Sequence, residues 1–213
     1  SAPKGTRDLL RPDSERFRAF VDTFAGVAEA AGYEQVVLPM MEHVEVFHRL
    51  GDATDIVQKE MFEFDDRGGR RLALRPEQTA STVRAFVENR PTLPWKAWYA
   101  GPNFRAENVQ KGRYRQFDQV GVEVLGVEDP YVDVEVIALA WRFFEALGLR
   151  QLSLGVNSLG DAGDRVRYAA ALHEHFGAHL DVLSEQSRET LQRNPLRVLD
   201  SKRAEDAPFI ASA

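Results

Sequence analysis

The 213-residue sequence has no cysteine, no long apolar run and no excess of positive charge. A chain without cysteine forms no disulfide, has no thiol nucleophile and binds no zinc through sulfur. None of its apolar runs approaches the ~20 residues that a membrane helix needs. The N-terminal segment Ser1–Asp8 has no apolar stretch of the secretory kind. We therefore expect a soluble, cytoplasmic protein without a membrane partner.

The charge balance is acidic, with a net charge of -6 and an isoelectric point of about 5.5. This argues against a protein that coats nucleic acid with one broad basic surface. A local basic site is nevertheless present, because four cations lie within eleven residues, opposed only by Glu107: Arg105, Lys111, Arg113 and Arg115. The sequence contains no glycine-rich phosphate loop of the GxGxxG or GxxxxGK[ST] type. Side chains and strands would therefore have to hold any nucleotide.

Apolar periodicity predicts helices over 14–31, 77–89, 130–147, 163–175, 178–192 and 204–211. Alternation predicts strands over 35–38, 61–64, 70–74, 96–105, 116–125 and 151–156. Asp13 or Ser14 is expected to cap the first helix, and Asp129 the helix that begins at Pro130. The composition becomes more polar after residue 160, where we place a domain boundary.

The predicted hairpin 96–125 contains the residues best suited to chemistry. Its basic loop contains Gly112 near the middle. The loop can close over a polyphosphate, because guanidinium groups pair bidentately with phosphate oxygens. In its second strand, Gln119 and Glu123 share a face, roughly 13 Å apart along the strand. An amide and a carboxylate so placed suit the ammonium or amide edge of a small ligand. The alternatives are a solvated loop and a solvent-facing sheet surface.

Glu77 and Thr79 form a third candidate group, in the first turn of the helix predicted at 77–89. Carboxylates and hydroxyls favour helix N-termini, so capping explains them as well as ligand binding does. No nucleophile–base pair accompanies these residues. The five histidines do not share one predicted face as metal ligands would, and we expect no protein metal cluster: His43, His48, His173, His175 and His179.

Six segments, in order along the chain, resemble segments of the histidyl-tRNA synthetase family. They are Lys4–Asp8 (KGTRD), 51–61 (GDATDIVQKEM), Arg75–Thr79 (RPEQT), 101–126 (GPNFRAENVQKGRYRQFDQVGVEVLG), Asn157–Asp161 (NSLGD) and 194–202 (NPLRVLDSK). The segment 101–126 is similar to the family's motif 2. A lone FRxE pattern is a weak signal, whereas six such segments in order form a strong one.

The resemblance implies a class II synthetase-like α+β fold, with an antiparallel sheet of six or seven strands flanked by helices. Residues 1–160 would then be the N-terminal part of the catalytic core, with motifs 1 and 2. Residues 161–213 would begin a helical insertion domain. The resemblance also implies a homodimer formed through motif 1, which here covers the helix 14–31 and the strand that ends at Pro39.

The resemblance further implies a role for each candidate residue. Arg105 would hold the ATP α-phosphate and act in catalysis, Glu107 would approach the adenine, and Arg113 would contact the β- or γ-phosphate. The histidine pocket would consist of Glu77, Thr79, Gln119 and Glu123. The implied reaction joins L-histidine to ATP as histidyl-adenylate, with Mg²⁺ as cofactor, and then transfers the histidyl group to tRNA(His). Positioning and charge stabilisation suffice for its first step.

The sequence departs from the family pattern at Gln78, where glycine is usual, and at Asp118, where histidine is usual. Gln78 is expected to narrow the pocket, while Asp118 lies on the strand face opposite Gln119. The sequence also ends before the family's second histidine-binding segment, motif 3 and anticodon-binding domain. We therefore expect the isolated chain to be inactive or weakly active in charging tRNA.

Two other functions are compatible with the same segments. One is a histidyl-tRNA-synthetase-like regulatory subunit of ATP phosphoribosyltransferase, which senses histidine without charging tRNA. The intact motif 2 residues, Arg105, Glu107, Arg113, Gln119 and Glu123, favour the synthetase over this alternative. The other is a non-catalytic interaction module. A chain that binds neither histidine nor ATP would support this alternative.

Overall fold

The structure is a computed structural model that describes residues 1–48, 60–158 and 160–213. The chain divides into two compact units, Ser1–Leu152 and Ser153–Ala213. All but the last two residues of the family-like segment 51–61 lie outside the described residues, as does Leu159. Each unit is an independent assembly of helices or strands around its own apolar core.

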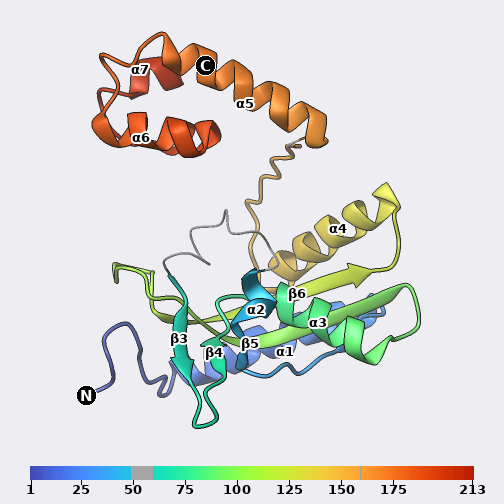
Figure 1. Ribbon diagram of the computed structural model, residues 1–213. Helices are drawn as coiled ribbons and strands as arrows, with labels where there is room; N and C mark the ends of the chain where they lie inside the picture. Colours follow the sequence, from blue (N-terminus) through green and yellow to red (C-terminus); the bar gives the residue numbers. More distant parts are fainter. Residues whose placement is uncertain (49–59, 159) are drawn as a thin grey trace. The chain divides into compact units, whose positions relative to one another are not determined.

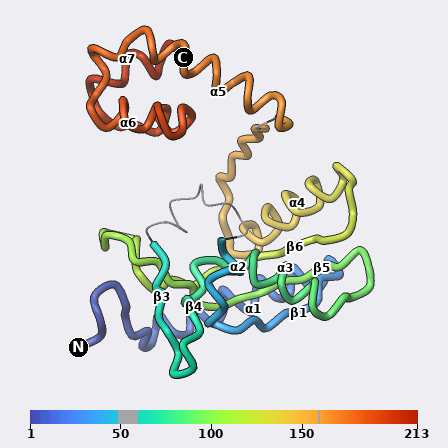
Figure 2. Tube along the Cα trace, viewed as in Figure 1, coloured from blue at the N-terminus to red at the C-terminus, as the bar shows by residue number. Residues whose placement is uncertain are grey.

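The described strands of the first unit form two three-stranded sheets (Figure 1). The first has the order β1-β5-β6, with β1 at Glu34–Gln35, β5 at Trp95–Phe104 and β6 at Gln116–Leu125. Its short strand β1 pairs parallel to β5, beside which it lies in Figure 2. The second sheet is antiparallel in the order β2-β4-β3, with strands Met41–His43, Arg71–Leu74 and Phe62–Asp65.

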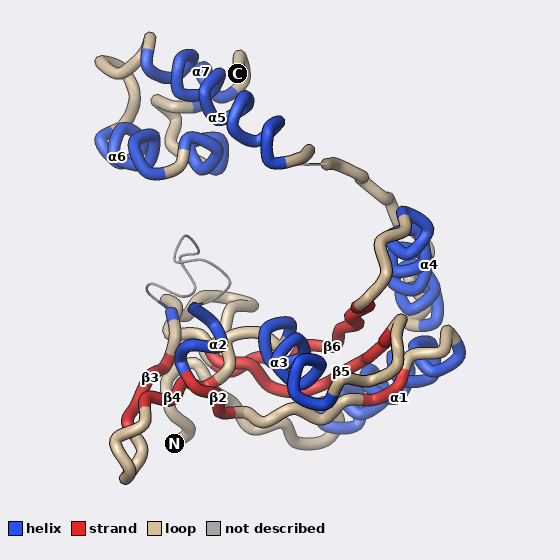
Figure 3. The backbone as a smooth tube through the Cα atoms, turned by 45° about the vertical axis from the view of Figure 1, so that its right-hand side comes forward, coloured by secondary structure: helices blue, strands red, loops and turns tan. Residues whose placement is uncertain are grey.

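The helices of the first unit cover both faces of the β1-β5-β6 sheet, as Figure 3 shows. Helices α1 (Asp13–Ala30) and α4 (Pro130–Ala146) pack on one face. There Phe24 makes edge-to-face contacts with Phe143 and Trp98, with ring centroids 5.0 and 6.2 Å apart, which is a favoured aromatic geometry. Helix α3 (Thr79–Asn89) covers the other face, where Phe86 stacks on Trp95. The expected α+β fold is therefore confirmed.

The ends of these helices agree only partly with the sequence prediction. Asp129 caps α4 as predicted, accepting a hydrogen bond from the Tyr131 backbone N–H at 2.9 Å. The predicted capping of α1 by Asp13 or Ser14 is wrong, because α1 begins at Asp13 itself and Pro12 occupies the capping position. Strand β2 and the five-residue helix α2 (Val44–His48) were not predicted, because elements this short show no periodicity.

The second unit is helical, with α5 at Ala162–Gly177, α6 at Glu185–Arg193, the 3₁₀ helix η2 at Pro195–Asp200 and α7 at Ala207–Ile210. Its core consists of five buried residues: Leu172, Phe176, Leu183, Leu191 and Val198. The helix predicted at 178–192 begins only at Glu185, because the Ser184 side chain caps it by accepting a hydrogen bond from the Ser187 N–H.

The strand predicted at 151–156 is absent from the structure, so that prediction is wrong. A strand needs a partner for its backbone N–H and C=O groups, and no described strand pairs with this segment. Within the residues described, none of the helices combines the length and apolar character needed to cross a bilayer.

Candidate active site

Strands β5 and β6 present two chemically different faces. The ladder pairs Tyr99 with Gly121 and Gly101 with Gln119. One face is apolar and packs against α1 and α4 through Trp98, Ala100, Val120, Val122 and Val124. By alternation along each strand, the opposite face carries Tyr99, Asn103, Gln119 and Glu123. Gln119 and Glu123 thus share one face of the sheet, and Asp118 lies on the other, as predicted.

Glu123 is held at one of its two carboxylate oxygens. The Thr79 hydroxyl, at the first residue of α3, donates to Glu123 Oε1 at 2.6 Å. The Tyr99 hydroxyl donates to the same oxygen at 3.3 Å. Among the described residues, no hydrogen bond reaches Oε2. Two of the predicted histidine-binding residues, Thr79 and Glu123, are thus in direct contact, with one carboxylate oxygen available to a ligand.

Tyr99 is a site residue that the sequence analysis missed. Burial and the nearby charge of Glu123 raise the pKa of its hydroxyl, so Tyr99 stays a hydrogen-bond donor near neutral pH. Its ring crosses to the opposite strand over Gly121, where an added Cβ would stand 2.5 Å from the Tyr99 oxygen. Glycine at position 121 therefore makes room for the tyrosine. The strand pairing of Tyr99 with Gly121 was the missing signal, and it depends on a register that single-strand alternation does not provide.

Gln119 is held in a similar way from strand β5. Asn103, which is fully buried, donates from Nδ2 to Gln119 Oε1 at 2.5 Å. Gln119 Nε2 has no hydrogen bond to another described residue. The Asn103 Oδ1 atom is buried and also lacks a partner in the described part of the chain. Sequence analysis missed Asn103 for the same reason that it missed Tyr99.

Glu77 performs the capping role that the sequence analysis left open. Its carboxylate accepts hydrogen bonds from the backbone N–H groups of Thr79 and Ala80, the latter at 2.9 Å. Gln78, expected to narrow the pocket, is buried, and its amide donates to the Gly101 carbonyl at 3.4 Å. The first turn of α3 is thereby fixed to the sheet, and Thr79 is fixed opposite Glu123.

Arg105 extends the same face beyond the end of β5. Its Nε donates to the Pro76 carbonyl at 3.0 Å, and its guanidinium lies 5.0 Å from the centre of the Phe117 ring. Phe117 precedes Gln119 by two residues, so both side chains lie on one face of β6. The structure therefore brings the predicted phosphate-binding arginine beside the predicted amino-acid pocket.

Glu107 joins the predicted ATP-binding residues into one cluster. Arg113 Nε lies 2.9 Å from Glu107 Oε2, and Arg105 lies 4.0 Å from Glu107 Oε1. Arg115 Nε donates to the Glu107 carbonyl at 3.3 Å. The Glu107 side chain is only 13% exposed, whereas Arg113 is 59% exposed. The cations that would meet phosphate are thus gathered around one carboxylate.

The family-like N-terminal segment Lys4–Asp8 is joined to the base of this loop by its backbone. The Gly5 carbonyl accepts hydrogen bonds from the N–H groups of Arg115 and Gln116, at 2.8 and 3.1 Å. Arg115 in turn accepts the Arg105 N–H at 2.8 Å. Gly5 has a φ of 86°, and a Cβ there would stand 2.7 Å from the Arg115 side chain. Glycine at position 5 therefore permits this close approach.

Arg75, in the family-like segment Arg75–Thr79, has a structural role. It is 3% exposed and donates to three backbone carbonyls, those of Pro102, Leu38 and Pro39, at 2.8, 2.9 and 3.3 Å. Burial lowers the pKa of this guanidinium, while Glu42 and Asp118 oppose that shift. Arg75 thus links three chain segments beneath the site.

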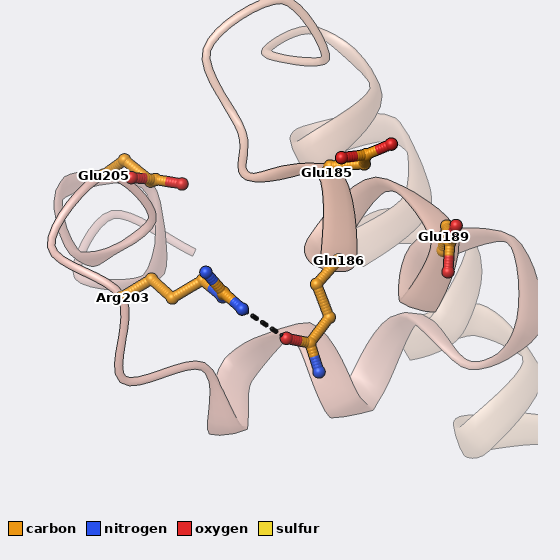
Figure 4. Close-up of a pocket in the computed structure, with 5 residues that line it drawn as sticks. All are labelled: Glu185, Gln186, Glu189, Arg203 and Glu205. Atoms are coloured by element: carbon orange, nitrogen blue, oxygen red, sulfur yellow. Dashed lines mark hydrogen bonds between the residues drawn. The ribbon is translucent and has the colours of Figure 1, made fainter.

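No group of three or more ligating side chains that could hold a metal ion occurs within residues 1–48, 60–158 and 160–213. The second unit has a pocket of about 440 Å³ (Figure 4). Its five lining residues include none of the predicted site residues: Glu185, Gln186, Glu189, Arg203 and Glu205. In Figure 4 the Arg203 guanidinium reaches the Gln186 amide oxygen, at 2.5 Å.

Comparison with known proteins places the chain among the synthetases. The histidyl-tRNA synthetase family model matches residues 5–200. The histidine–tRNA ligase of Limosilactobacillus fermentum is 48% identical over 99% of this chain, which spans 50% of that protein. The apo histidyl-tRNA synthetase of S. aureus has a TM-score of 0.72 and 32% identity, over 100% of this chain and 53% of that one.

A Bacillus halodurans protein described as an ATP phosphoribosyltransferase regulatory subunit/histidyl-tRNA synthetase has a TM-score of 0.68 at 24% identity, over 99% of this chain and 54% of that one. At this identity the likeness shows the fold alone. The chain spans about half the length of the curated relatives it matches. The match to the family model, which covers nearly the whole sequence in agreement with the geometry of the site, shows that this chain belongs to the histidyl-tRNA synthetase family.

Proposed function

We propose that this chain forms the ATP- and histidine-binding part of a histidine–tRNA ligase, which makes histidyl-adenylate and transfers the histidyl group to tRNA(His). The observation that supports this best is the arrangement on one sheet face. Arg105 stacks against Phe117, and Gln119 and Glu123 follow on the same strand. Among the described residues, the Gln119 amide donor and one Glu123 carboxylate oxygen have no partner. A cation suited to phosphate thus adjoins polar groups suited to an amino acid.

In the proposed reaction, the histidine carboxylate attacks the α-phosphorus of ATP and pyrophosphate leaves. Arg105 is held in place by the Pro76 carbonyl and the Phe117 ring before any ligand binds. A cation fixed in advance stabilises the charge that develops on the α-phosphate without further reorganisation. Arg113, more exposed and on the loop, would exchange its contact with Glu107 for the outer phosphates.

The amino-acid end of the pocket would bind histidine through complementary polar atoms. Glu123 Oε2 is an acceptor and carries charge, while Gln119 Nε2 is a donor. Glu77 would contact the α-amino group of histidine while keeping its capping hydrogen bonds. The Thr79 hydroxyl, which donates to Glu123, would also contact the ligand. Holding both substrates in line replaces a bimolecular encounter by a positioned reaction, which accounts for a site without a nucleophile–base pair.

Magnesium fits this site only in association with ATP. The described residues offer no cluster of three or more metal-ligating side chains, and Mg²⁺ in nucleotide sites is commonly held by phosphates with one or two carboxylates. When bound, the ion would neutralise phosphate charge. Glu107, which lies near both Arg105 and Arg113, is the carboxylate that would help to hold it.

A homodimer through motif 1 is a further part of the proposal. The segment that follows α1 exposes three apolar side chains: Val37 at 84%, Met40 at 52% and Met41 at 52%. Exposed apolar side chains that adjoin in sequence favour burial against a second surface. Sedimentation equilibrium would test this, since a chain that stays monomeric at high micromolar concentration contradicts it.

Calorimetric titration of the chain with MgATP and with L-histidine tests the ligand assignment. We expect both to bind, and Arg105→Ala to weaken ATP binding at least tenfold. Arg70→Ala serves as a matched control, because Arg70 is exposed between β3 and β4 and forms a local ion pair with Asp66. Absence of binding for both ligands would favour a non-catalytic interaction module.

Histidine-dependent exchange between ATP and pyrophosphate tests the reaction itself. The assay uses a form of the protein that is active in this exchange. Removal of one charge-stabilising donor typically lowers such rates by about 10²- to 10³-fold, and we expect that loss for Arg105→Ala. Histidine binding without exchange in the wild type would favour a histidine-sensing regulatory subunit instead. Near-normal exchange in Arg105→Ala would show that its assigned role is wrong.

A further inference from the structure

The polar residues of β6 that face the amino-acid pocket are each held by a residue of β5. Tyr99 donates to Glu123, and Asn103 donates to Gln119. The two β5 residues are 6% and 0% exposed, so they lie beneath the residues that would meet a ligand. Of these two contacts, the bond from Asn103 is the shorter, at 2.5 Å against 3.3 Å.

We infer that Asn103 is a positioning residue of the amino-acid pocket, which fixes the Gln119 amide so that its Nε2 donates to an acceptor atom of the bound amino acid. This inference deepens the proposed function and rests on it. An amide has two faces of opposite hydrogen-bonding character, a carbonyl oxygen and an NH₂ group. Asn103 engages the oxygen of Gln119, so the NH₂ group is the face left for a ligand.

The stability of the fold does not explain why position 103 is asparagine. Asn103 is fully buried, yet its Oδ1 has no hydrogen-bond partner among the described residues. A buried amide acceptor without a partner destabilises a protein, and an apolar side chain of similar volume avoids that penalty. The bond that Asn103 does make leads to Gln119, a residue of the proposed pocket. Orientation of Gln119 therefore accounts for a residue that fold stability disfavours.

The surrounding backbone leaves Gln119 few other ways to be held. Its cross-strand neighbour is Gly101, which has no side chain. A Cβ at Gly101 would stand 2.6 Å from the Arg75 guanidinium, so a larger residue there has no room. The two neighbouring positions on the same face of β5 are Tyr99 and Asn103. Tyr99 donates to Glu123, and Asn103 is the one that donates to Gln119.

Two substitutions separate this positioning role from a structural one. Asn103→Leu removes the donor with little change in volume. We expect it to weaken L-histidine binding by about tenfold, as loss of a buried hydrogen bond does, without lowering the melting temperature. Asn103→Asp replaces the donor by an acceptor, so the Gln119 amide must turn and present its oxygen. We expect it to weaken histidine binding more than Asn103→Leu does.

The decisive experiment is a double-mutant cycle on the full 213-residue chain, with calorimetric titration of L-histidine. If Asn103 acts through Gln119, Asn103→Leu changes the histidine Kd less than about twofold in a Gln119→Leu background. Asn89→Leu is the matched control, because the Asn89 amide donates to the Ala85 carbonyl at the far end of α3. We expect its histidine Kd to equal that of the wild type.

Three outcomes would overturn the inference while leaving the proposed function intact. They are an unchanged Kd in Asn103→Leu, an equal loss of affinity in both backgrounds, and a large drop in melting temperature on Asn103→Leu. A wild-type chain that binds no histidine would overturn the proposed function itself, and this inference with it. The wild-type titration therefore distinguishes the two failures.

Discussion

The two units of the chain each hold a carboxylate by hydrogen bonds, but in opposite ways. In the second unit, Asp206 is fully buried and accepts four hydrogen bonds, from the Ser184 N–H and from three serine hydroxyls: Ser184, Ser187 and Ser201. In the first unit, Glu123 is half-buried and accepts two bonds at one oxygen, leaving the other without a partner in the described structure. A fully satisfied carboxylate stabilises a fold, whereas a half-satisfied one is available to a ligand.

The same contrast distinguishes the roles of two family-like segments, 194–202 and 101–126. The stretch 194–202 supplies Val198 to the core of the second unit and Ser201 to the cluster around Asp206. Val198 and Ser201 therefore have structural roles. The segment 101–126 contains the loop and strand with partly satisfied polar groups, and its role is ligand binding in our proposal.

The largest effect is expected from Asp206→Ala. It would leave several buried donors without an acceptor, at about 1–3 kcal/mol for each unsatisfied group. We expect the second unit to lose about 3–5 kcal/mol of unfolding free energy, measured by hydrogen exchange, while the histidine Kd stays unchanged. Asp181→Ala is the control at an exposed aspartate of the same unit. If amides of the first unit lost as much protection from hydrogen exchange, Asp206 would not stabilise the second unit specifically, and the contrast between the units would fail.

Acid should act on the second unit through the same residue. Burial by itself would raise the pKa of Asp206, but hydrogen bonds from Ser187, Ser201 and Ser184 outweigh it and lower the pKa to about 2. Because the folded pKa lies below the unfolded value of about 3.9, this stabilisation is complete only above about pH 5. It is lost as the pH falls toward 2, by about 2 kcal/mol. In urea titrations of Asp206→Asn, this pH dependence should vanish.

A moderate effect is expected from Glu123→Ala, now on ligand binding rather than on folding. Loss of the charged acceptor should raise the histidine Kd about tenfold or more, because Glu123 is the carboxylate that accepts from the Thr79 and Tyr99 hydroxyls in the described structure. Its melting temperature should change little, since Glu123 is half-buried. If the substitution mainly unfolds the first unit, Glu123 belongs with Asp206 as a structural carboxylate, and the contrast fails.

The smallest effect is expected from Tyr99→Phe. The Tyr99 hydroxyl is 3.3 Å from Glu123 Oε1, and Thr79 is the closer donor to that atom. Removing one weak neutral donor should raise the histidine Kd by about threefold. Calorimetry at several pH values near neutrality should show no change of pH dependence, because the raised pKa of Tyr99 keeps it protonated there.

The sequence predicted the hairpin. It also predicted that Gln119 and Glu123 point to the same face of one strand, because the two-residue repeat of a strand is a local property. It predicted α1, α3 and α4 for the same kind of reason. It did not predict Tyr99 and Asn103, whose importance depends on which β6 residues lie opposite them. The wrong strand at 151–156 has a related cause, because alternation suggests a strand but only a partner makes one.

Local patterns in the sequence thus determined the long helices, the motif 2 hairpin and the family. Tertiary structure decided which polar groups are satisfied. Hydrogen-bond satisfaction joins residues far apart in the chain, as Thr79 and Glu123 are, or Ser184 and Asp206. No periodicity records such pairs, because their energy depends on distances that exist only after the chain has folded.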